Sequence, residues 1–366
     1  MKLAIICSSG AWGGLEINIF NVCKWLSQSN IELVVFTKTG SKIDLELKAI
    51  GIHTIEFDQK GKKHLQFANA KYLAQRLDKH HIKNVLIGHY EQHYTCVLAT
   101  LFSKNRLNII YMQQMQHNIK KFGPYYYLLY KRVNTWLTPL ESLKEQLLKN
   151  THLSENQIKI LPLCLETDRF YKNTISKAEA KAQFGYSEND FIIGTIGRLD
   201  KEKGQETILK AAEILKNQIP QLKILLAGEE TAGGTGYKNL LLALANKTDI
   251  NDNMQLLPFQ KDTPNLFKAL DVFIMSSKSE PYGMVTLEAL LSGTNVIGTN
   301  SGGTIDLLNK GKYGQLYAFG DANTLASHIL NLYNLKETVN AQDHALEINQ
   351  KYSHLVWVEE FCRLLN

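Results

Sequence analysis

The sequence has little of several features that mark special classes of protein. Proline is scarce, with 7 residues, and together with the 24 glycines this excludes a collagen-like or proline-rich chain. No stretch approaches the ~20 consecutive apolar residues that a membrane-spanning helix needs. The 5 cysteines are widely spaced and form no Cys-x-x-Cys pair, which argues against a disulfide framework or a structural zinc site. We therefore expect buried free thiols.

The remaining composition is that of a globular protein with two domains. The chain has 366 residues, of which 44% are hydrophobic and 21% are charged. These values exclude wholesale disorder, and the length exceeds that of one compact core. The apolar run that follows Met1 is too short for a signal peptide and has no cleavage site, so we expect a cytoplasmic protein.

Positive charge is concentrated in the first half of the chain. Residues 1–175 contain 23 Lys and Arg against 13 Asp and Glu, whereas the remainder contains 18 against 22. Such an asymmetry indicates that the N-terminal half faces an anionic partner. The candidates are a membrane surface, a phosphorylated substrate and a nucleic acid.

Short apolar runs rich in β-branched residues alternate with segments of helical periodicity along the whole chain. This alternation predicts parallel sheets covered by helices on both faces, the α/β doubly wound arrangement. In the first half the predicted strands are Lys2–Cys7, Glu32–Thr37, His53–Phe57, Asn84–Gly88, Asn108–Gln113 and Thr135–Thr138. In the second half they are Phe191–Ile196, Lys223–Ala227, Met254–Leu257, Val272–Met275 and Asn295–Ile297.

The alternation pauses at residues 162–176, which suggests an interdomain connection. We therefore predict two Rossmann-like domains, at residues 1–168 and 169–349, facing a central cleft. Ligands of such folds bind at the carboxyl ends of the strands. Apolar residues recur at helical spacing to the end of the chain, so residues 341–366 are predicted as helix. We expect residues 350–366 to pack back on the first domain.

Three strand-to-helix loops have residues suited to an anionic ligand. The first, Ser8–Glu16, contains Gly13 and Gly14 ahead of a predicted helix, where backbone amides can approach an anion. It lacks the Gly-x-Gly-x-x-Gly spacing, so the fingerprint of nicotinamide-binding domains is absent. A ligand-binding loop and a plain tight turn both remain open for this segment.

The second loop, Gly194–Gly204, follows the first strand of the second domain. Arg198 and Lys203 lie where a strand ends and a helix begins. Two fixed cations there suit a pyrophosphate, because an arginine can bridge two oxygens and a lysine adds a point charge. A solvated charged loop is the alternative.

The third loop, Ser279–Glu288, is the most informative. Glu280 lies between a predicted strand and a predicted helix, and Glu288 lies about one turn into that helix. Amides around Gly283–Val285 would face an anion at the helix N-terminus, and Glu288 would accept hydrogen bonds from a diol such as ribose. Either glutamate alone is better explained as a solvated or capping residue. In combination with the two cations of the second loop, they indicate a binding site.

At these residues the sequence resembles the retaining glycosyltransferases of family 4, which have the two-domain GT-B fold. It has their Glu-x7-Glu element in Glu280 and Glu288, and their Gly-Arg…Lys-Gly element in residues 197–204. The loop Gly13–Glu16 and the run Ser301–Gly303 match further elements of the family. The similarity extends over essentially the whole chain.

The resemblance implies a role for each matching residue. Arg198 and Lys203 would hold the diphosphate of the donor and offset charge on the departing nucleotide. Glu288 would bind the ribose hydroxyls, and Glu280 would contact hydroxyls of the transferred sugar. His117 matches the family's cleft histidine, which binds the donor sugar or lines the reaction centre; a structural histidine is the alternative. The implied donor-binding set also includes Gly13, Gly14, Tyr282, Gly283, Met284 and Val285.

The family implies transfer of a sugar from a nucleotide-diphosphate donor, by default a UDP-sugar, with retention of configuration. The implied acceptor is a glycan or a lipid-linked molecule in synthesis of bacterial-type cell-surface polysaccharide or lipopolysaccharide. The chain has no Asp-x-Asp motif and no His/Asp cluster of metal-ligand spacing. Because Arg198 and Lys203 would take the place of a metal, we expect metal independence and no cofactor.

The sequence departs from the family's usual pattern at three places. Asp306 stands where the family often has Glu, and Glu229-Glu230 stand where a second glycine is common. The segment Leu163–Glu166 lacks the frequent Asn-Gly. These differences leave the donor sugar and its base open.

Other classes of protein are less consistent with the sequence. A nucleic-acid-binding protein would explain the positive charge, but no reader module is recognisable and half of the chain is acidic. A GT-B phosphorylase would be much longer and would need a pyridoxal-phosphate lysine site that we do not find. A catalytically silent nucleotide-sugar-binding protein on the same fold remains the alternative to an enzyme.

The basic first half is the acceptor side in this fold. Residues 120–132 combine aromatic side chains with four cations, and residues 60–64 add more positive charge. Aromatic and basic residues together suit the interface of an anionic membrane. We therefore expect a peripheral protein on the inner face of the membrane, with a helix whose aromatic side chains face the core and whose lysines are solvated as the alternative.

Overall fold

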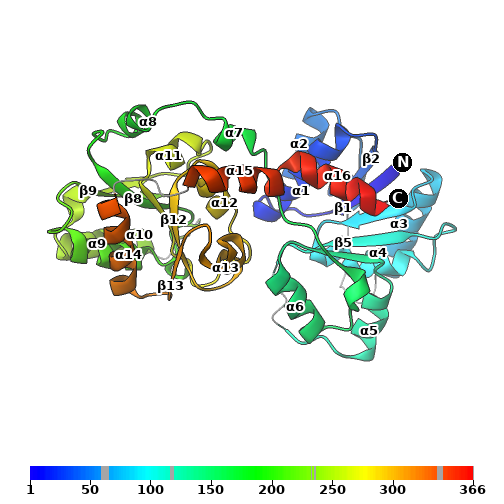
Figure 1. Cartoon of the computed structure of the whole chain (residues 1–366). Helices are drawn as coiled ribbons and strands as arrows, with labels where there is room; N and C mark the ends of the chain where they lie inside the picture. The colour runs from blue at the N-terminus through cyan, green and yellow to red at the C-terminus, as the bar shows by residue number, and fades with distance from the viewer. Residues whose placement is uncertain (59–65, 116–118, 232, 235, 336–340, 366) are drawn as a thin grey trace. The chain divides into compact units, whose positions relative to one another are not determined.

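The chain divides into two compact units. The computed structural model describes residues 1–58, 66–115, 119–231, 233–234, 236–335 and 341–365. The first unit contains Met1–Leu163 together with His354–Asn366, and the second contains Cys164–Ser353 (Figure 1). The last helix of the chain therefore belongs to the first unit, whereas the second unit is one continuous segment.

The first unit is built around a seven-stranded parallel sheet. Along the sheet the strands follow the order β3-β2-β1-β4-β5-β6-β7. This is the Rossmann order, which reverses direction between β1 and β4. The strands are β1 (Lys2–Cys7), β2 (Glu32–Thr37), β3 (Thr54–Glu56), β4 (Asn84–Ile87), β5 (Asn108–Met112), β6 (Thr135–Thr138) and β7 (Ile158–Ile160).

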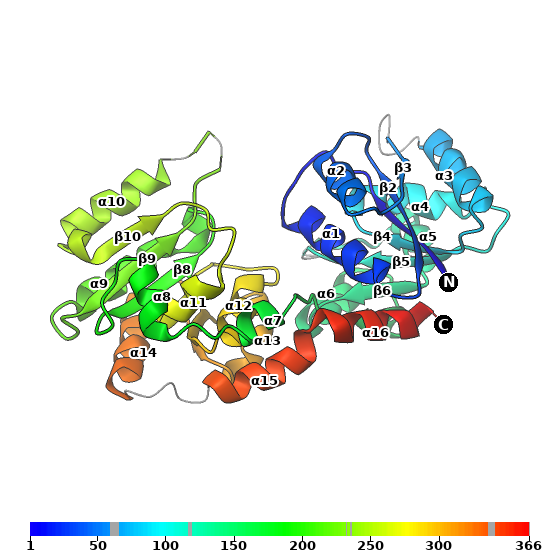
Figure 2. The same cartoon turned by 90° about the horizontal axis from the view of Figure 1, so that it is seen from above.

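Helices cover both faces of this sheet because its strands are apolar on both sides. Residues Leu3–Cys7 of β1 are all fully buried, with alternate side chains pointing to opposite faces. One face packs against α3 (Phe67–Lys79), α4 (His93–Ala99), α5 (Pro124–Lys131) and α6 (Glu141–Asn150). On the other face lie α1 (Gly14–Ser27), α2 (Lys42–Ala49) and α16 (His354–Leu365), as Figure 2 shows from above.

The second unit repeats the same plan with six parallel strands. Their order, β10-β9-β8-β11-β12-β13, is again the Rossmann order, with its reversal between β8 and β11. The strands are β8 (Phe191–Ile196), β9 (Leu222–Ala227), β10 (Met254–Leu257), β11 (Val272–Met275), β12 (Asn295–Thr299) and β13 (Gln315–Tyr317).

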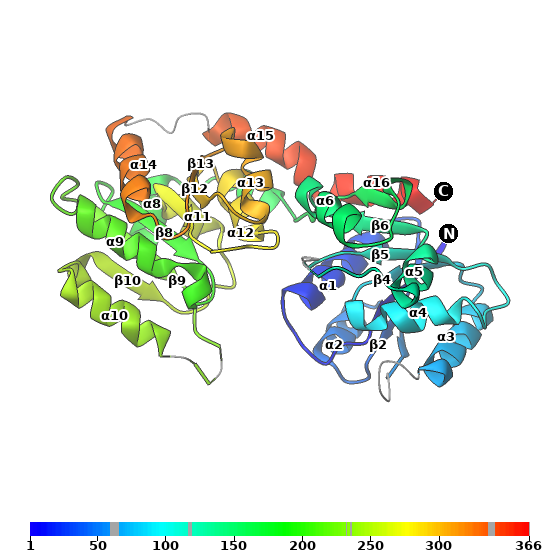
Figure 3. The ribbon, with the colours of Figure 1, turned by 90° about the horizontal axis from the view of Figure 1, so that it is seen from below.

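Two layers of helices enclose this second sheet (Figure 3). One layer consists of α9 (Gln205–Leu215), α10 (Tyr237–Lys247) and α14 (Ala322–Leu335). The other consists of α8 (Lys177–Gln183), α11 (Pro264–Ala269), α12 (Met284–Leu291), α13 (Gly303–Leu307) and α15 (Ala341–Tyr352), with the short α7 (Asp168–Tyr171) beside α12 and α15. The predicted fold class, two Rossmann-like doubly wound domains, is confirmed.

The structure adds two strands and divides one helix that the sequence analysis treated otherwise. The edge strands β7 and β13 have only three residues each and are partly exposed, so no apolar run marks them. The helix predicted over residues 341–366 is present as two helices, α15 and α16, which are separated at Ser353. Ser353 forms a β-bridge with Leu165, and the amide of Leu165 donates to the carbonyl of Tyr352 at 3.2 Å. The break between the two helices therefore lies where the backbone bonds to the segment around Leu165.

A buried carboxylate, Asp44, fixes α2 to the edge of the first sheet. It accepts hydrogen bonds from Thr37 Oγ1 at 2.8 Å, Thr54 Oγ1 at 2.9 Å and the amide of Gly40 at 3.0 Å. Lys48 Nζ lies 2.8 Å from its Oδ2. Burial acts to raise the pKa of Asp44, but the four donors outweigh it and lower the pKa to about 2.

The lowered pKa predicts a stability that depends on pH. Since the carboxylate binds its proton less readily when folded, its contribution is present above the ordinary pKa and is lost as the pH falls toward 2. We expect Asp44→Asn to reduce the free energy of unfolding by roughly 2 kcal/mol at pH 6. Urea denaturation at pH 6 and near pH 2 measures the free energy of unfolding of both proteins. A difference between variant and wild type that stays constant down to pH 2 would contradict this explanation.

Candidate functional site

Three predicted site residues of the second unit lie in loops at the carboxyl ends of β8 and β11. Arg198 lies two residues after β8, and Lys203 ends the short 3-10 turn η3 (Lys201–Lys203) that leads into α9. Glu280 lies in the loop between β11 and α12. Because β8 and β11 are the neighbouring strands at which the strand order reverses, this is the position where open α/β sheets bind ligands.

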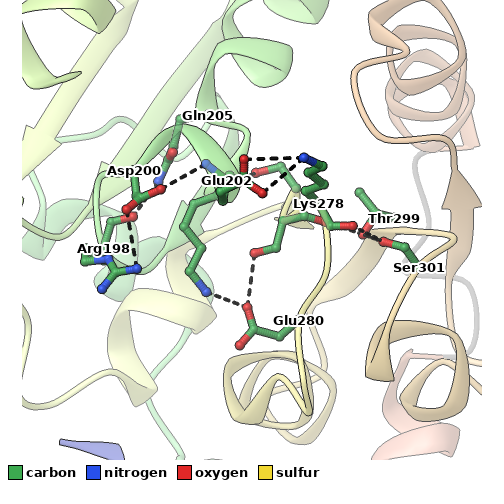
Figure 4. Close-up of polar contacts among 11 residues, drawn as sticks. Arg198, Asp200, Glu202, Gln205, Lys278, Glu280, Thr299 and Ser301 are labelled. Carbon is green, nitrogen blue, oxygen red and sulfur yellow. Dashed lines mark hydrogen bonds and ion pairs between the residues drawn. The ribbon is translucent and has the colours of Figure 1, made fainter. Parts of the chain in front are cut away.

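An ion pair joins the two loops. Lys203 Nζ lies 2.5 Å from Glu280 Oε2, although the residues are 77 positions apart in the sequence. The hydroxyl of Ser277 donates to the same carboxylate oxygen at 3.2 Å. Figure 4 shows the Glu280 carboxylate at the meeting point of these two contacts. The side chains of Lys203 and Glu280 are 29% and 18% exposed, so the pair is partly shielded from water and open to a ligand.

The backbone around this ion pair is fixed by contacts between the same two loops. Ser276 Oγ donates to the carbonyl of Lys203 at 2.6 Å, and the amide of Lys278 donates to the carbonyl of Glu202 at 2.8 Å. Gly204 has φ +70, and a Cβ there would lie 2.2 Å from the carbonyl oxygen of Ser276. Only glycine fits this position, which explains the Lys-Gly pair of the sequence.

The Ser301–Gly303 run holds Glu280 from the opposite side. The amide of Gly303 donates to the carbonyl of Glu280 at 2.8 Å. Gly302 has φ +57, and a Cβ there would lie 2.4 Å from that carbonyl oxygen. Ser301 Oγ donates to the carbonyl of Lys278 at 2.7 Å (Figure 4). The run therefore serves to position the glutamate loop.

Arg198 is near this pair in the chain but makes different contacts. Its guanidinium is 51% exposed and its Nη2 lies 3.3 Å from Asp200 Oδ2. The buried Gln205 holds the loop by donating from Nε2 to the carbonyl of Arg198 at 2.9 Å (Figure 4). An exposed pair of this kind is weak, so the guanidinium can reorient toward a ligand at little cost.

The N-terminus of α12 follows the glutamate loop. Gly283 caps this helix with φ +95 and makes no side-chain cap hydrogen bond, while the amide of Thr286 donates to the carbonyl of Gly283 at 2.9 Å. The hydroxyl of Thr286 in the first turn is buried and has no hydrogen-bond partner among the described residues. Tyr282 is buried, whereas Met284 and Val285 are partly exposed. Free amides at a helix N-terminus attract an anion.

Glu288 lies further along α12 and is not in contact with the ion pair. Thr263 Oγ1 donates to its Oε2 at 3.2 Å. Burial raises the pKa of Glu288, while the Thr263 hydrogen bond and the charge of Arg169 oppose this rise. A partly buried carboxylate with a single neutral donor has free acceptor capacity for a ligand hydroxyl.

In the first unit, a side chain of the following helix α1 bonds to the loop that contains Gly13 and Gly14. Glu16 Oε2 accepts a hydrogen bond from the amide of Gly13 at 2.9 Å, and Ser9 Oγ donates to Glu16 Oε1 at 2.7 Å. The amide of Gly13 is thus occupied. A Cβ at Gly14 would meet nothing within 4 Å, so packing does not require glycine there. His117 and residues 60–64 lie outside the described residues.

Sequence reasoning missed the side chains that support the predicted ones. Ser276, Ser277 and Thr263 bond to Lys203, Glu280 and Glu288 respectively. Serine and threonine are common in loops, and no local pattern marks these contacts across the chain. In the described part of the chain, no group of three or more His, Cys, Asp or Glu is arranged to hold a metal ion.

Two Rossmann-like units with a candidate ligand site in the second define a class of two-domain α/β protein. Known structures of the same fold were found by comparison. A glycosyltransferase from Rickettsia africae superposes with a TM-score of 0.89 at 20% identity, covering 99% of this chain and 97% of that one. HepE from Anabaena, in complex with UDP, superposes with a TM-score of 0.86 at 18% identity, covering 100% and 99%. At these identities the likeness shows the fold, which is GT-B.

Sequence comparison agrees with the resemblance found in the sequence. Residues 176–347, which lie in the second unit, match the family model described as glycosyl transferases group 1. The capsular polysaccharide biosynthesis glycosyltransferase CapM of Staphylococcus aureus is 27% identical over 60% of this chain and 58% of its own length. The putative glycosyltransferase EpsD of Bacillus subtilis is 30% identical over 49% and 46%. The match thus spans about half the length of these curated relatives.

The raised pKa of Glu288 predicts how a neutral replacement behaves. A carboxyl whose pKa is raised by folding stabilises the protein at low pH, and this contribution is lost as the pH rises through the raised pKa. Glu288→Gln keeps an acceptor for Thr263 and removes the buried charge. We expect the variant to have a higher Tm than wild type at pH 8 and the same Tm at pH 4. The prediction would be contradicted if the Tm of the variant, compared with that of wild type at the same pH, were lower at pH 8 than at pH 4.

Proposed function

We propose that this protein is a retaining glycosyltransferase that moves a sugar from a UDP-sugar donor to a glycan or lipid-linked acceptor during synthesis of a bacterial-type cell-surface polysaccharide or lipopolysaccharide. The observation that supports this best is the Lys203–Glu280 ion pair, which lies at the ligand-binding edge of the second sheet and leads into the uncapped N-terminus of α12. The name of CapM refers to capsular polysaccharide, and HepE was solved with UDP.

The donor's diphosphate is assigned to the cations and the helix terminus. The ammonium of Lys203 has three hydrogens, so it can keep its contact with Glu280 and still donate to phosphate oxygens. Arg198 can exchange its exposed pairing with Asp200 for a bidentate contact to phosphate. Amides at Gly283, Met284 and Val285 add donors at the positive end of α12.

The hydroxyl groups of the donor are assigned to the two glutamates. Oε1 of Glu280 receives no hydrogen bond among the described residues, which leaves an acceptor for the transferred sugar. Glu288 is assigned to the ribose. Tyr282 is part of the same loop, and for Gly13, Gly14 and His117 of the first unit we keep the donor-binding role that the family resemblance implies.

In the proposed reaction the acceptor hydroxyl attacks the sugar from the face that the nucleotide leaves. The bond between the anomeric carbon and the diphosphate oxygen breaks, a bond to the acceptor oxygen forms, and the proton of the hydroxyl passes to the leaving phosphate. The protein contributes positioning and electrostatic stabilisation of the departing diphosphate. With Arg198 and Lys203 present to neutralise that charge, we propose that no metal is required.

Removal of either cation tests these assignments. We expect Arg198→Ala and Lys203→Ala each to lower kcat roughly 10²-fold, the loss typical of one group that stabilises developing charge. Lys201→Ala is the matched control, because it removes an exposed cation from the same loop. The measurement is release of UDP from UDP-glucose and related donors, with and without EDTA.

Three results would contradict the assignments. Turnover near the wild-type rate in both cation variants would remove the proposed phosphate site. Loss of activity in EDTA, restored by Mg²⁺, would overturn metal independence. Binding of donor without any turnover on a panel of glycan and lipid-linked acceptors would favour a silent nucleotide-sugar-binding protein.

We further propose that the acceptor is reached at an anionic membrane surface through the first unit. Exposed apolar side chains occur on α5, where Tyr125 is 43% and Leu128 is 61% exposed, and at the end of α4, where Leu101 is 54% exposed. The two helices are joined by a hydrogen bond from Arg132 Nη1 to Thr100 Oγ1 at 3.2 Å. We call the exposed residues Tyr125, Leu128, Arg132 and Leu101 the α5 surface.

The sequence segment that forms the α5 surface contributes charge of one sign. Residues 92–140 contain six Lys and Arg and no Asp or Glu. Lys131 and Arg132 are both exposed at the end of α5, and Lys131 Nζ lies over the ring of Tyr127 at 5.4 Å. Exposed apolar groups beside cations match the boundary between anionic headgroups and acyl chains. In the described residues, no helix is both long enough and apolar enough to cross a bilayer.

Sedimentation with liposomes tests the α5 surface. We expect the protein to pellet with phosphatidylglycerol vesicles at low salt but not with phosphatidylcholine vesicles, because the attraction is partly electrostatic. Leu128→Glu and Arg132→Glu should each reduce pelleting several-fold. Leu240→Glu and Lys238→Glu, at exposed positions on α10 of the second unit, are the matched controls. Equal pelleting with both lipids, or equal effects of the two pairs of variants, would contradict this proposal.

A further inference from the structure

We propose that Ser277 is a positioning residue that orients the Glu280 carboxylate toward the sugar of the donor. Its neighbour Ser276 instead positions Lys203, the residue that we assign to the diphosphate. The two serines follow β11 directly and are almost completely buried, with exposed fractions of 4% and 1%. Both hydroxyls donate to acceptors of the protein itself. The inference rests on the proposed function of the site and adds a division of work within it.

Ser277 determines which oxygen of Glu280 is available. Its hydroxyl and the ammonium of Lys203 both donate to Oε2, at 3.2 and 2.5 Å. Oε1 receives no hydrogen bond within the described residues. Without Ser277, the carboxylate would be held by Lys203 alone and could rotate about its terminal torsion, which has a broad range of allowed angles. The serine thus restricts the rotation of the carboxylate, which the ion pair alone would allow.

The support for Ser277 is itself rigid. Thr299 Oγ1 donates to the carbonyl of Ser277 at 2.7 Å, from the end of the neighbouring strand β12. The amide of Gly303 fixes the backbone of Glu280 through a 2.8 Å hydrogen bond to its carbonyl. The carboxylate is therefore anchored by its side chain and by the backbone on which it stands.

Ser276 acts on the other partner of the ion pair. Its hydroxyl donates to the carbonyl of Lys203 at 2.6 Å, and among the described residues it forms no hydrogen bond with Glu280. Lys203 is the residue assigned to the diphosphate, which is present in UDP and in UDP-sugars alike. Loss of Ser276 should therefore affect both ligands, whereas loss of Ser277 should affect only the ligand that has a sugar.

Calorimetric titration with UDP and with UDP-glucose separates these roles. For Ser277→Ala we expect the Kd of UDP to stay within twofold of wild type and the Kd of UDP-glucose to rise about tenfold, the effect of one hydrogen bond to a charged group. Ser277→Thr retains the hydroxyl and should restore most of the affinity for UDP-glucose. For Ser276→Ala we expect both Kd values to rise by a similar factor.

The outcomes distinguish this inference from the function on which it rests. If the wild type binds none of UDP, GDP and ADP and none of their glucose conjugates, the proposed function fails. This inference then fails with it. If the wild type binds a nucleotide and its glucose conjugate but Ser277→Ala weakens both equally, the serine is merely structural. If Ser277→Ala changes neither, Glu280 needs no orienting group. The last two results overturn the inference and leave the proposed function standing.

Discussion

The ion pair between Lys203 and Glu280 is the constraint on which the rest of the site depends. Each partner comes from a different strand-to-helix loop, so the pair can form only if β8 and β11 lie side by side in register. Burying two charges costs free energy that their attraction alone does not always return. Here the carboxylate gains a second donor in Ser277, and both loops are fixed by glycines that allow close backbone approach.

The topology explains why the site lies at this edge. Both units have the Rossmann strand order, and in each unit the loop after the first strand lies beside the reversal point. The two loops are nevertheless in different states. In the second unit the cations and the α12 terminus have capacity for an anion, whereas in the first unit Glu16 already occupies the amide of Gly13. The family match likewise falls in the second unit, at residues 176–347.

Much of this arrangement could be predicted from sequence because the signals are local. Apolar runs gave the long central strands, and the spacing of Glu280 and Glu288 placed one in a loop and the other on a helix. Contacts between distant segments could not be predicted. Nothing in the order of residues shows that Ser277 shares an oxygen of Glu280 with Lys203, or that Thr263 supports Glu288. The helix break at Ser353 depends on Leu165 in the same way.

The most direct test of the account is a crystal structure of the protein with UDP and with UDP-glucose. The account predicts that the diphosphate lies within hydrogen-bond distance, about 3 Å, of Lys203 Nζ and of the first amides of α12. It also predicts that a sugar hydroxyl faces Oε1 of Glu280 while Oε2 keeps its two donors. A nucleotide bound with its phosphates away from Lys203 and α12, or an ion pair left intact with no ligand contact, would contradict the central claim.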